Sequence, residues 1–155
     1  MGDLQGSLSA EHYRTRVAVE DLLGGVKMRV IATIDVGDLD HAVAFYSSGL
    51  GFVEQRRMFD GAVCELLAGS TLIYLASKPA GTPPFPGSSE LRRYSRHWTP
   101  VHLDLVVPDI EVAVARAQAA GAKLEGAIRE EGAWREAQMS DPFGHGFCLL
   151  EGWPP

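Results

Sequence analysis

Hydrophobic residues along the chain follow a pattern typical of a strand, then a pattern typical of a helix, then patterns typical of further strands. This series of patterns occurs twice. The first copy begins at 29–36 with β-branched residues that favour a strand. Apolar residues then recur every three to four positions behind Asp38, a residue suited to capping a helix. Three short extended segments, separated by turn residues, follow at 52–57, 62–67 and 71–76. Residues 29–76 are therefore predicted to form a βαβββ unit.

The same unit is predicted again in the second half of the chain. Residues 77–99 are rich in proline and glycine, which indicates an extended linker. The segment Val36-Gly37-Asp38-Leu39 has its counterpart in Val107-Pro108-Asp109-Ile110, 71 positions later. The second copy is predicted to contain a helix from Asp109 to about Ala120 and strands at 100–107, 123–130, 133–139 and 146–151. Duplication of so short a unit favours two similar sheets around a shared surface over a doubly wound sheet.

Length and charge narrow the class of protein. The 155 residues have the size of one domain. A formal net charge of −6 argues against the basic surface that nucleic-acid binding requires. Cys64 and Cys148 lie far apart, which indicates no disulfide framework and suits a reducing compartment. No secretory signal or apolar run of membrane-spanning length is present. A cytoplasmic protein without nucleic-acid or membrane partners is therefore expected.

Residues 1–28 precede the first predicted strand and are interpreted as an N-terminal extension. Ser9 as a cap and Gly24-Gly25 as a stop predict a short amphipathic helix within it. This helix could cover part of the domain, contact a second subunit or be loosely attached. One domain is then expected over 29–153, with modules at 29–76 and 100–153.

Particular motifs in both modules carry a family resemblance. The first module contains Ile34-Asp35-Val36-Gly37-Asp38-Leu39, then Phe45-Tyr46, then Gly49-Leu50-Gly51-Phe52, and the second contains 101–109 and the closing Asp141-Pro142-Phe143-Gly144-His145. These segments resemble the vicinal oxygen chelate superfamily, which includes glyoxalase I, extradiol dioxygenases and bleomycin-resistance proteins. The ending is most similar to a glyoxalase-like branch. The resemblance implies an α+β fold of two tandem βαβββ modules, in which a curved mixed sheet surrounds a ligand cup and the helices lie outside.

Alternation along the strands predicts which side chains face this cup. In 101–107, the residues Val101, Leu103, Leu105 and Val107 form an apolar face suited to packing under a helix. His102, Asp104 and Val106 are left on the cup face. The residues expected to contact a ligand are Ile31, Thr33, Asp35, Tyr74, His102, Asp104, Trp134 and Cys148.

The resemblance also implies four metal-binding positions, one near each end of the two modules. These positions carry Ile31, Tyr74, His102 and Cys148. Only His102 is a standard ligand, since Ile31 has no donor atom and a thiolate favours softer ions than magnesium or manganese. No metal and no other cofactor is therefore expected. A divalent ion, if one is bound, is expected at His102 together with Cys148, Glu151 or His145.

His102 and Asp104 are the candidate catalytic residues. They lie two apart on a predicted strand, so their side chains point to the same face. A histidine oriented by a carboxylate can act as a general base near neutral pH, or the two groups can simply satisfy one another.

The linker also contains a basic cluster, which consists of Arg92, Arg93, Arg96 and His97. This cluster could close over an anionic ligand, or it could form a solvated loop or a dimer contact.

Three of the four positions implied for metal binding do not carry a standard ligand, and this observation leads to the expected function. We expect a glyoxalase-like or bleomycin-resistance-like protein that binds a small aromatic or carbonyl-bearing compound in its cup without metal. The alternative is a divergent enzyme of the superfamily, either a metal-dependent lyase or dioxygenase or a metal-free isomerase that uses His102 and Asp104. A regulatory module is a third possibility. A homodimer is expected because twofold dimers are the commonest soluble oligomers.

Overall fold

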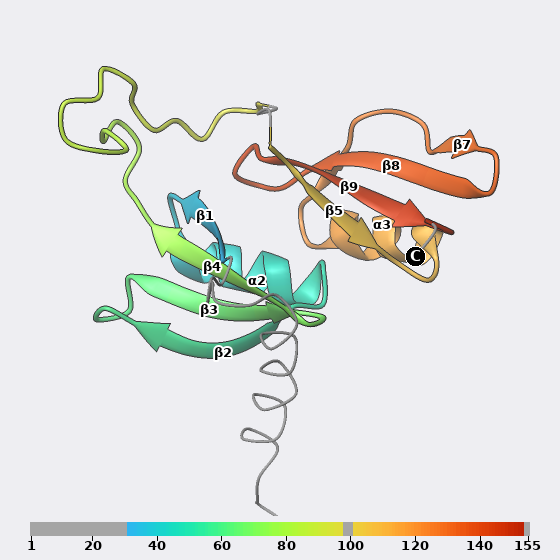
Figure 1. The fold of residues 1–155 in the computed structure, drawn as a ribbon, viewed down its shortest axis with the longest axis horizontal. Helices are drawn as coiled ribbons and strands as arrows, with labels where there is room; N and C mark the ends of the chain where they lie inside the picture. The colour runs from blue at the N-terminus through green and yellow to red at the C-terminus, as the bar shows by residue number, and fades with distance from the viewer. Residues whose placement is uncertain (1–30, 98–100, 154–155) are drawn as a thin grey trace, which may run out of the picture. The chain divides into compact units, whose positions relative to one another are not determined.

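The computed structural model describes residues 31–97 and 101–153, and Figure 1 shows their fold. Two mixed sheets, of four and five strands, each carry one helix, so the fold belongs to the α+β class. The helix predicted between residues 9 and 25 lies outside the described residues. The two-module α+β fold expected from the repeat is confirmed.

The first module has the predicted order of elements. It consists of β1 (Ala32–Val36), α2 (Leu39–Ser48), β2 (Val53–Met58), β3 (Val63–Ala68) and β4 (Thr71–Ser77). The strands are ordered β1-β4-β3-β2, with β1 parallel to β4 and the other pairs antiparallel. Asp38 caps α2 by accepting the backbone N–H of His41 at 3.0 Å. The long connection between β1 and β4 allows their parallel pairing.

The second module repeats this topology with one additional short strand. It consists of β5 (Leu103–Val106), α3 (Ile110–Ala119), β6 (Lys123–Leu124), β7 (Arg129–Glu131), β8 (Trp134–Ser140) and β9 (Gly146–Glu151). The order is β5-β9-β8-β6, and β7 pairs with the first three residues of β8. Asp109 caps α3 as Asp38 caps α2, since its carboxylate accepts the N–H of Val112 at 2.9 Å.

Two predicted strand boundaries were wrong. The strand expected at 123–130 is divided into β6 and β7, because after Glu125 the chain leaves the ladder around Gly126, where a glycine weakens strand pairing. The strand expected from Pro100 begins only at Leu103. His102 therefore lies directly before β5 rather than within it.

The core joins both modules. Helix α2 buries Phe45 and Tyr46, and α3 buries Ile110 and Val114. The ring of Phe45 packs against Phe147 of β9, with centroids 6.5 Å apart. The two helices also contact one another. Burial of these apolar side chains is the main force that holds the modules together.

The described part of the linker, 78–97, contains no helix or strand but is attached at several points. The guanidinium of Arg92 donates to Asp35 of β1 at 2.6 Å, and His97 forms a parallel bridge with His145. Gly144, with a φ of +90°, allows this approach, because a Cβ there would lie 2.5 Å from the carbonyl oxygen of Ser95. None of the described helices is long and apolar enough to cross a membrane.

Candidate functional site

A cavity of about 420 Å³ opens between β1 and β5. These are the end strands of their sheets, and no ladder pairs them in the described part of the chain. Apolar walls come from both strands, from the end of α2 and from β9, and they are formed by Ala32, Ile34, Leu50, Leu103, Leu105 and Phe147. We call this space the β1–β5 cavity. Its volume is within the range that holds a small organic molecule.

The lining corrects one sequence-based interpretation. Leu103 and Leu105 were expected to pack under a helix and to lie away from any ligand. Both do pack against the core, but both also line the β1–β5 cavity. The reason is that the cavity opens at the edges of two separate sheets, where side chains from either face of a strand can reach it. Alternation along one strand cannot reveal such an edge.

Polar side chains also contribute to the lining of the cavity. Three imidazoles contribute to the lining, those of His97, His102 and His145. Tyr46 lines it as well, and its hydroxyl donates to the buried carboxylate of Asp141 at 2.8 Å. Burial, followed by the charge of Asp141, raises the pKa of Tyr46 well above its ordinary value. Its phenol therefore remains a hydrogen-bond donor.

The basic cluster predicted in the linker is largely paired within the chain. Arg92 bonds Asp35, and Arg96 forms an ion pair with Glu125 that lowers the pKa of the Glu125 carboxyl. Tyr94 donates to the carbonyl oxygen of Lys78 at 2.8 Å. Of this cluster, His97 alone contributes to the described lining of the cavity. These contacts attach the linker to β1 through Asp35 and to the second module through Glu125.

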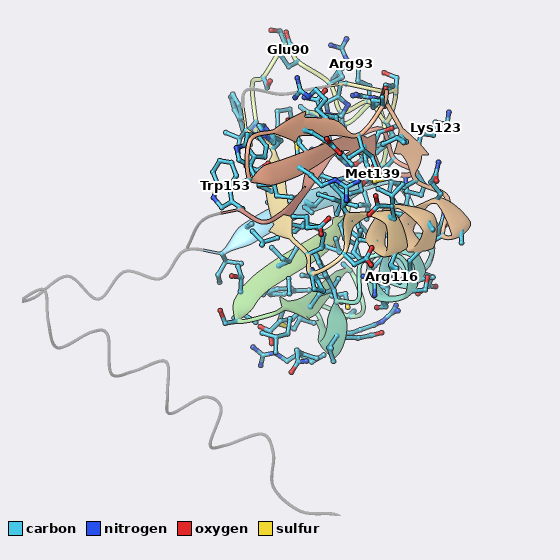
Figure 2. The ribbon with its side chains drawn as sticks, turned by 90° about the vertical axis from the view of Figure 1, so that its right-hand side faces the viewer. Glu90, Arg93, Arg116, Lys123, Met139 and Trp153 are labelled. Atoms are coloured by element: carbon cyan, nitrogen blue, oxygen red, sulfur yellow. The ribbon has the colours of Figure 1, made fainter. Side chains whose placement is uncertain are left out.

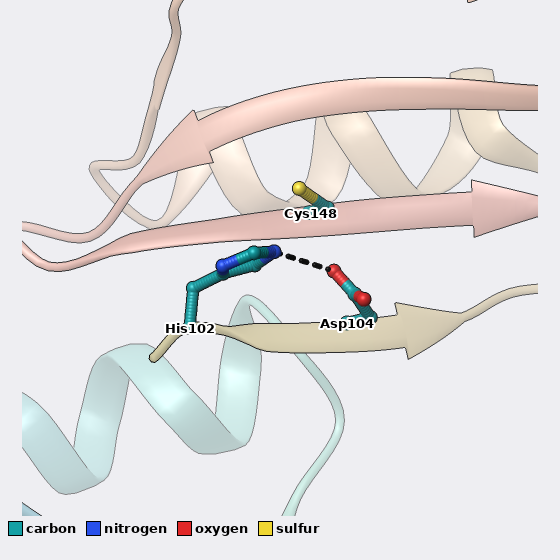
Figure 3. A group of neighbouring side chains, drawn as sticks. All are labelled: His102, Asp104 and Cys148. Atoms are coloured by element: carbon teal, nitrogen blue, oxygen red, sulfur yellow. Dashed lines mark ion pairs between the residues drawn. The ribbon is translucent and has the colours of Figure 1, made fainter. Parts of the chain in front are cut away.

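A second group of polar side chains lies on the face of the second sheet opposite α3 (Figure 3). His102 and Asp104 point toward one another, with Nε2 and Oδ1 3.2 Å apart. Cys148 projects from the neighbouring strand β9, because its register partner is Asp104. One donor atom from each of the three residues lies within 4.8 Å of the others. The expectation that His102 and Asp104 share a face is confirmed.

Cys148 is buried and is held as a thiol. Its Sγ donates to a carboxylate oxygen of Glu136 at 3.3 Å. Burial first, and this hydrogen bond second, raise the pKa of Cys148 to about 12. Glu136 also pairs with Arg129 across the β7–β8 ladder. The sulfur is therefore a weak nucleophile and a weak ligand as it stands, since both roles need a thiolate.

The other predicted ligand contacts are distributed over the molecule. Thr33, Asp35 and His102 line the β1–β5 cavity, whereas its described lining does not include the remaining five. Tyr74 donates to Glu65 at 2.8 Å on the first sheet. Trp134 packs edge-on against Trp153, with ring centroids 4.9 Å apart, and Figure 2 shows Trp153 at the end of β9. Ile31 immediately precedes β1.

The two alternative metal ligands proposed from the sequence are engaged elsewhere. Glu151 accepts the backbone N–H of Ile110 at 3.1 Å and pairs with Arg135, so it supports the start of α3. His145 bonds Asp141 through Nδ1 at 2.8 Å. Asp104, rather than either residue, completes the group around His102 and Cys148. Strand register produces this result, because Asp104 lies directly beside Cys148.

Sequence reasoning missed Tyr46 and Asp141 as parts of the site. Both residues were named within the motifs that carry the family resemblance, and neither was predicted to line a site. The sequence shows a phenol at a core-facing helix position and a carboxylate at the start of an Asp-Pro-Phe-Gly segment. Only the tertiary fold brings these two residues, 95 positions apart, into contact.

Comparison with known proteins identifies the class. The family model described as a glyoxalase-like domain matches residues 31–150, and the chain belongs to this family. The predicted resemblance to the vicinal oxygen chelate superfamily is thereby confirmed. No curated protein gives a significant match.

Solved structures show the same fold at low sequence identity. Hypothetical protein SA1046 of S. aureus has a TM-score of 0.62 and 22% identity, covering 82% of this chain and 99% of its own. TioX of a Micromonospora species has a TM-score of 0.62 and 17% identity, with 81% and 98% covered. A mutant of the fosfomycin resistance protein FosX of Listeria monocytogenes, described in complex with Mn(II) and a dihydroxypropylphosphonic acid, has a TM-score of 0.60 and 17% identity, with 81% and 90% covered.

The Mn(II) of that FosX complex raises the question of whether the residues here fit such an ion. The available group combines an imidazole, a carboxylate and a buried thiol. Manganese prefers carboxylate and other oxygen ligands, whereas sulfur selects softer ions such as zinc. The thiol would also have to lose a proton that burial and Glu136 retain. The donor set does not fit a manganese site.

Proposed function

We propose that this glyoxalase-like protein binds a small, aromatic or carbonyl-bearing organic compound in the β1–β5 cavity and does so without a metal. The observation that carries the proposal is the cavity of about 420 Å³. Ligand sites of this kind combine apolar walls with a few polar groups that fix orientation. A homodimer and a cytoplasmic location are part of the same proposal.

The apolar walls provide a surface that excludes water from the ligand, and the polar groups fix its orientation. Leu50, Leu103 and Phe147 present apolar surface on which a flat ring can be desolvated. The three imidazoles and Thr33 are lining side chains that offer hydrogen bonds to a ligand. Metal independence is supported by Cys148, which is held as a thiol and whose sulfur is a poor ligand for a hard cation.

A cavity-filling substitution tests ligand binding directly. In Leu105→Trp the larger side chain should occupy the cavity, and binding of the fluorescent aromatic probe 1-anilinonaphthalene-8-sulfonate should fall roughly tenfold or more, because the probe loses its apolar contacts. Probe fluorescence measures the affinity. Val106→Trp is the matched control, since Val106 is 63% exposed and is absent from the described lining of this cavity.

Equal probe affinity in both variants would place the ligand elsewhere and overturn the proposal. If Leu105→Trp does not fold, Val101→Trp provides a second test, because Val101 lines the cavity while remaining 81% exposed. Thermal unfolding of each variant establishes whether it is folded.

The alternative function is a divergent enzyme centred on His102, and the group of His102, Asp104 and Cys148 favours it. Elemental analysis of freshly purified protein separates metal-free binding from the metal-dependent form of this enzyme. We expect far less than one metal ion per chain, with no change in His102→Ala and none in the control His41→Ala, whose imidazole lies outside this group. One metal ion per chain that is lost only in His102→Ala would overturn metal independence and support a lyase or dioxygenase.

A further inference from the structure

Asp141 is a buried carboxylate whose hydrogen-bonding capacity is fully used. Its side chain has no exposed surface. Oδ1 accepts the backbone N–H groups of Phe143 at 2.9 Å and His145 at 2.8 Å. Oδ2 accepts the hydroxyl of Tyr46 and Nδ1–H of His145, both at 2.8 Å. Four donors stabilise the charged carboxylate in this position.

This arrangement determines the protonation pattern of His145. Because the carboxylate only accepts, the proton of the neutral imidazole resides on Nδ1. Nε2 then carries a lone pair and can only accept. The ring is one quarter exposed, with a side-chain exposure of 24%, and it lines the β1–β5 cavity. His145 is thus a base that a buried carboxylate holds in one tautomer, an arrangement suited to proton transfer.

The remaining polar groups around His145 do not replace this acceptor. The imidazole of His97 lies edge-on with its centroid 5.3 Å away, and its Nδ1 bonds the carbonyl oxygen of Ser95 at 2.8 Å. The ring of Tyr94 lies 6.2 Å away, and burial raises the pKa of its phenol. Tyr46 remains a protonated donor to Asp141. Around His145, Asp141 is thus the single carboxylate in contact with the ring among the described residues.

We infer that His145 is the proton acceptor of the β1–β5 cavity and that the cavity takes a small aromatic compound with an acidic hydroxyl group. This inference rests on the proposed binding function and names the ligand class. On binding, the hydroxyl O–H bond breaks and an N–H bond forms at Nε2. The oxygen keeps the electron pair as a phenolate, and the resulting imidazolium lies between two anions, the phenolate and Asp141. No oxidant, metal or further reactant is needed.

The lone pair at Nε2 is also the reason for preferring a hydroxyl to a carboxylate. An ionised carboxylate offers only acceptors, so it would face the lone pair of the neutral imidazole without a shared proton. A phenolic hydroxyl brings the missing donor, and its ring matches the apolar walls formed by Leu103 and Phe147.

The probe 4-nitrophenol tests the inference because its phenolate absorbs at a longer wavelength than its phenol. At a pH at which the free compound is mostly protonated, we expect the full chain to bind it and to produce the phenolate band. The ether 4-nitroanisole has the same ring but no acidic proton, and it should bind roughly tenfold more weakly, as expected for the loss of one hydrogen bond to a charged partner.

Two substitutions assign the effect to His145. His145→Phe removes the acceptor and keeps a ring, so the phenolate band and the preference for nitrophenol should both disappear. Asp141→Asn places an amide donor opposite Nδ1, which forces the proton onto Nε2 and should also remove the band. His41→Phe is the control, because this histidine packs on Phe143 of the same turn, with ring centroids 5.2 Å apart, but does not contribute to the described lining of the cavity.

A phenolate band that persists in His145→Phe overturns the inference, as does tighter binding of 4-nitrobenzoate than of 4-nitrophenol. Binding of nitrophenol without the band also overturns it but leaves ligand binding in the cavity intact. If neither nitrophenol nor the naphthalene sulfonate probe binds the wild-type chain, the proposed function itself fails. His145→Phe keeps the test decisive if Asp141→Asn does not fold.

Discussion

At the scale of single residues, Cys148 shows how burial changes chemistry that the sequence suggests. A cysteine near a histidine and an aspartate can be a metal ligand or a nucleophile. Here the residue is 3% exposed, and burial with the hydrogen bond to Glu136 raises its pKa from the ordinary value of 9.0 to about 12. The thiol form is therefore favoured in the folded protein.

This pKa predicts how stability depends on pH. Between about pH 9 and about pH 12 the unfolded thiol loses its proton while the folded thiol keeps it, so the free energy of unfolding should fall as pH rises through this window. One such group contributes at most about 1.4 kcal/mol per pH unit. Cys148→Ser has no titrating thiol and should lose stability less steeply in urea unfolding at alkaline pH.

The comparison between the two proteins isolates Cys148. Cys64, whose pKa burial raises to about 11, is present in both and contributes equally. Identical slopes for wild type and Cys148→Ser would show that Cys148 ionises in the folded state as readily as in the unfolded state.

At the scale of elements, the same capping device begins both helices. Asp38 and Asp109 occupy extended backbone conformations and accept N–H groups of the first helical turn. Each carboxylate also lies at the positive end of its helix dipole. The duplicated caps explain why both helices begin where the repeat in the sequence predicts.

Removal of either cap should destabilise the protein by a similar amount. We expect Asp38→Ala and Asp109→Ala each to lower the free energy of unfolding by about 1 kcal/mol, because one N–H in each first turn loses its acceptor. Urea denaturation measures the change. Asp38→Asn and Asp109→Asn retain a capping oxygen and should recover most of it. A loss equally large in the Asn variants would assign the effect to charge instead of the cap.

At the scale of the whole molecule, a buried hydrogen bond connects the modules. Tyr46 belongs to α2 of the first module, and Asp141 lies in the turn between β8 and β9 of the second. A second hydrogen bond between the modules comes from Arg116 of α3, whose Nε donates to the carbonyl oxygen of Gly49 at 2.9 Å. These bonds fix the β1–β5 cavity because the end of α2 and the β8–β9 turn both contribute to its lining.

Tyr46→Phe should therefore be more costly than an ordinary loss of a tyrosine hydroxyl. It removes a donor from a buried carboxylate, and we expect a loss of about 1.5–3 kcal/mol in the free energy of unfolding. Tyr94→Phe is the matched control. Its hydroxyl bonds a backbone carbonyl near the surface, so its loss should cost no more than about 1 kcal/mol in the same denaturation experiment. Equal losses in the free energy of unfolding would mean that the bond to Asp141 contributes no more than a bond to a backbone carbonyl near the surface.

The sequence alone determined the local elements and the family. Caps, turn residues and hydrophobic periods act over a few neighbours, so α2, α3 and most strands could be predicted within a few residues. The alternation of side chains also predicted that His102 and Asp104 share one face. Where a glycine interrupts pairing, as at Gly126, the local pattern overestimated the strand.

Only the tertiary structure decided where a cavity forms. The β1–β5 cavity lies between the edges of two sheets, and Leu103 and Leu105 reach it although their spacing indicates a face under a helix. The hydrogen bond that Tyr46 donates to Asp141 joins residues from different modules. Such contacts depend on how the two modules pack against one another. This packing depends on the complete core, so a short segment of sequence cannot predict it.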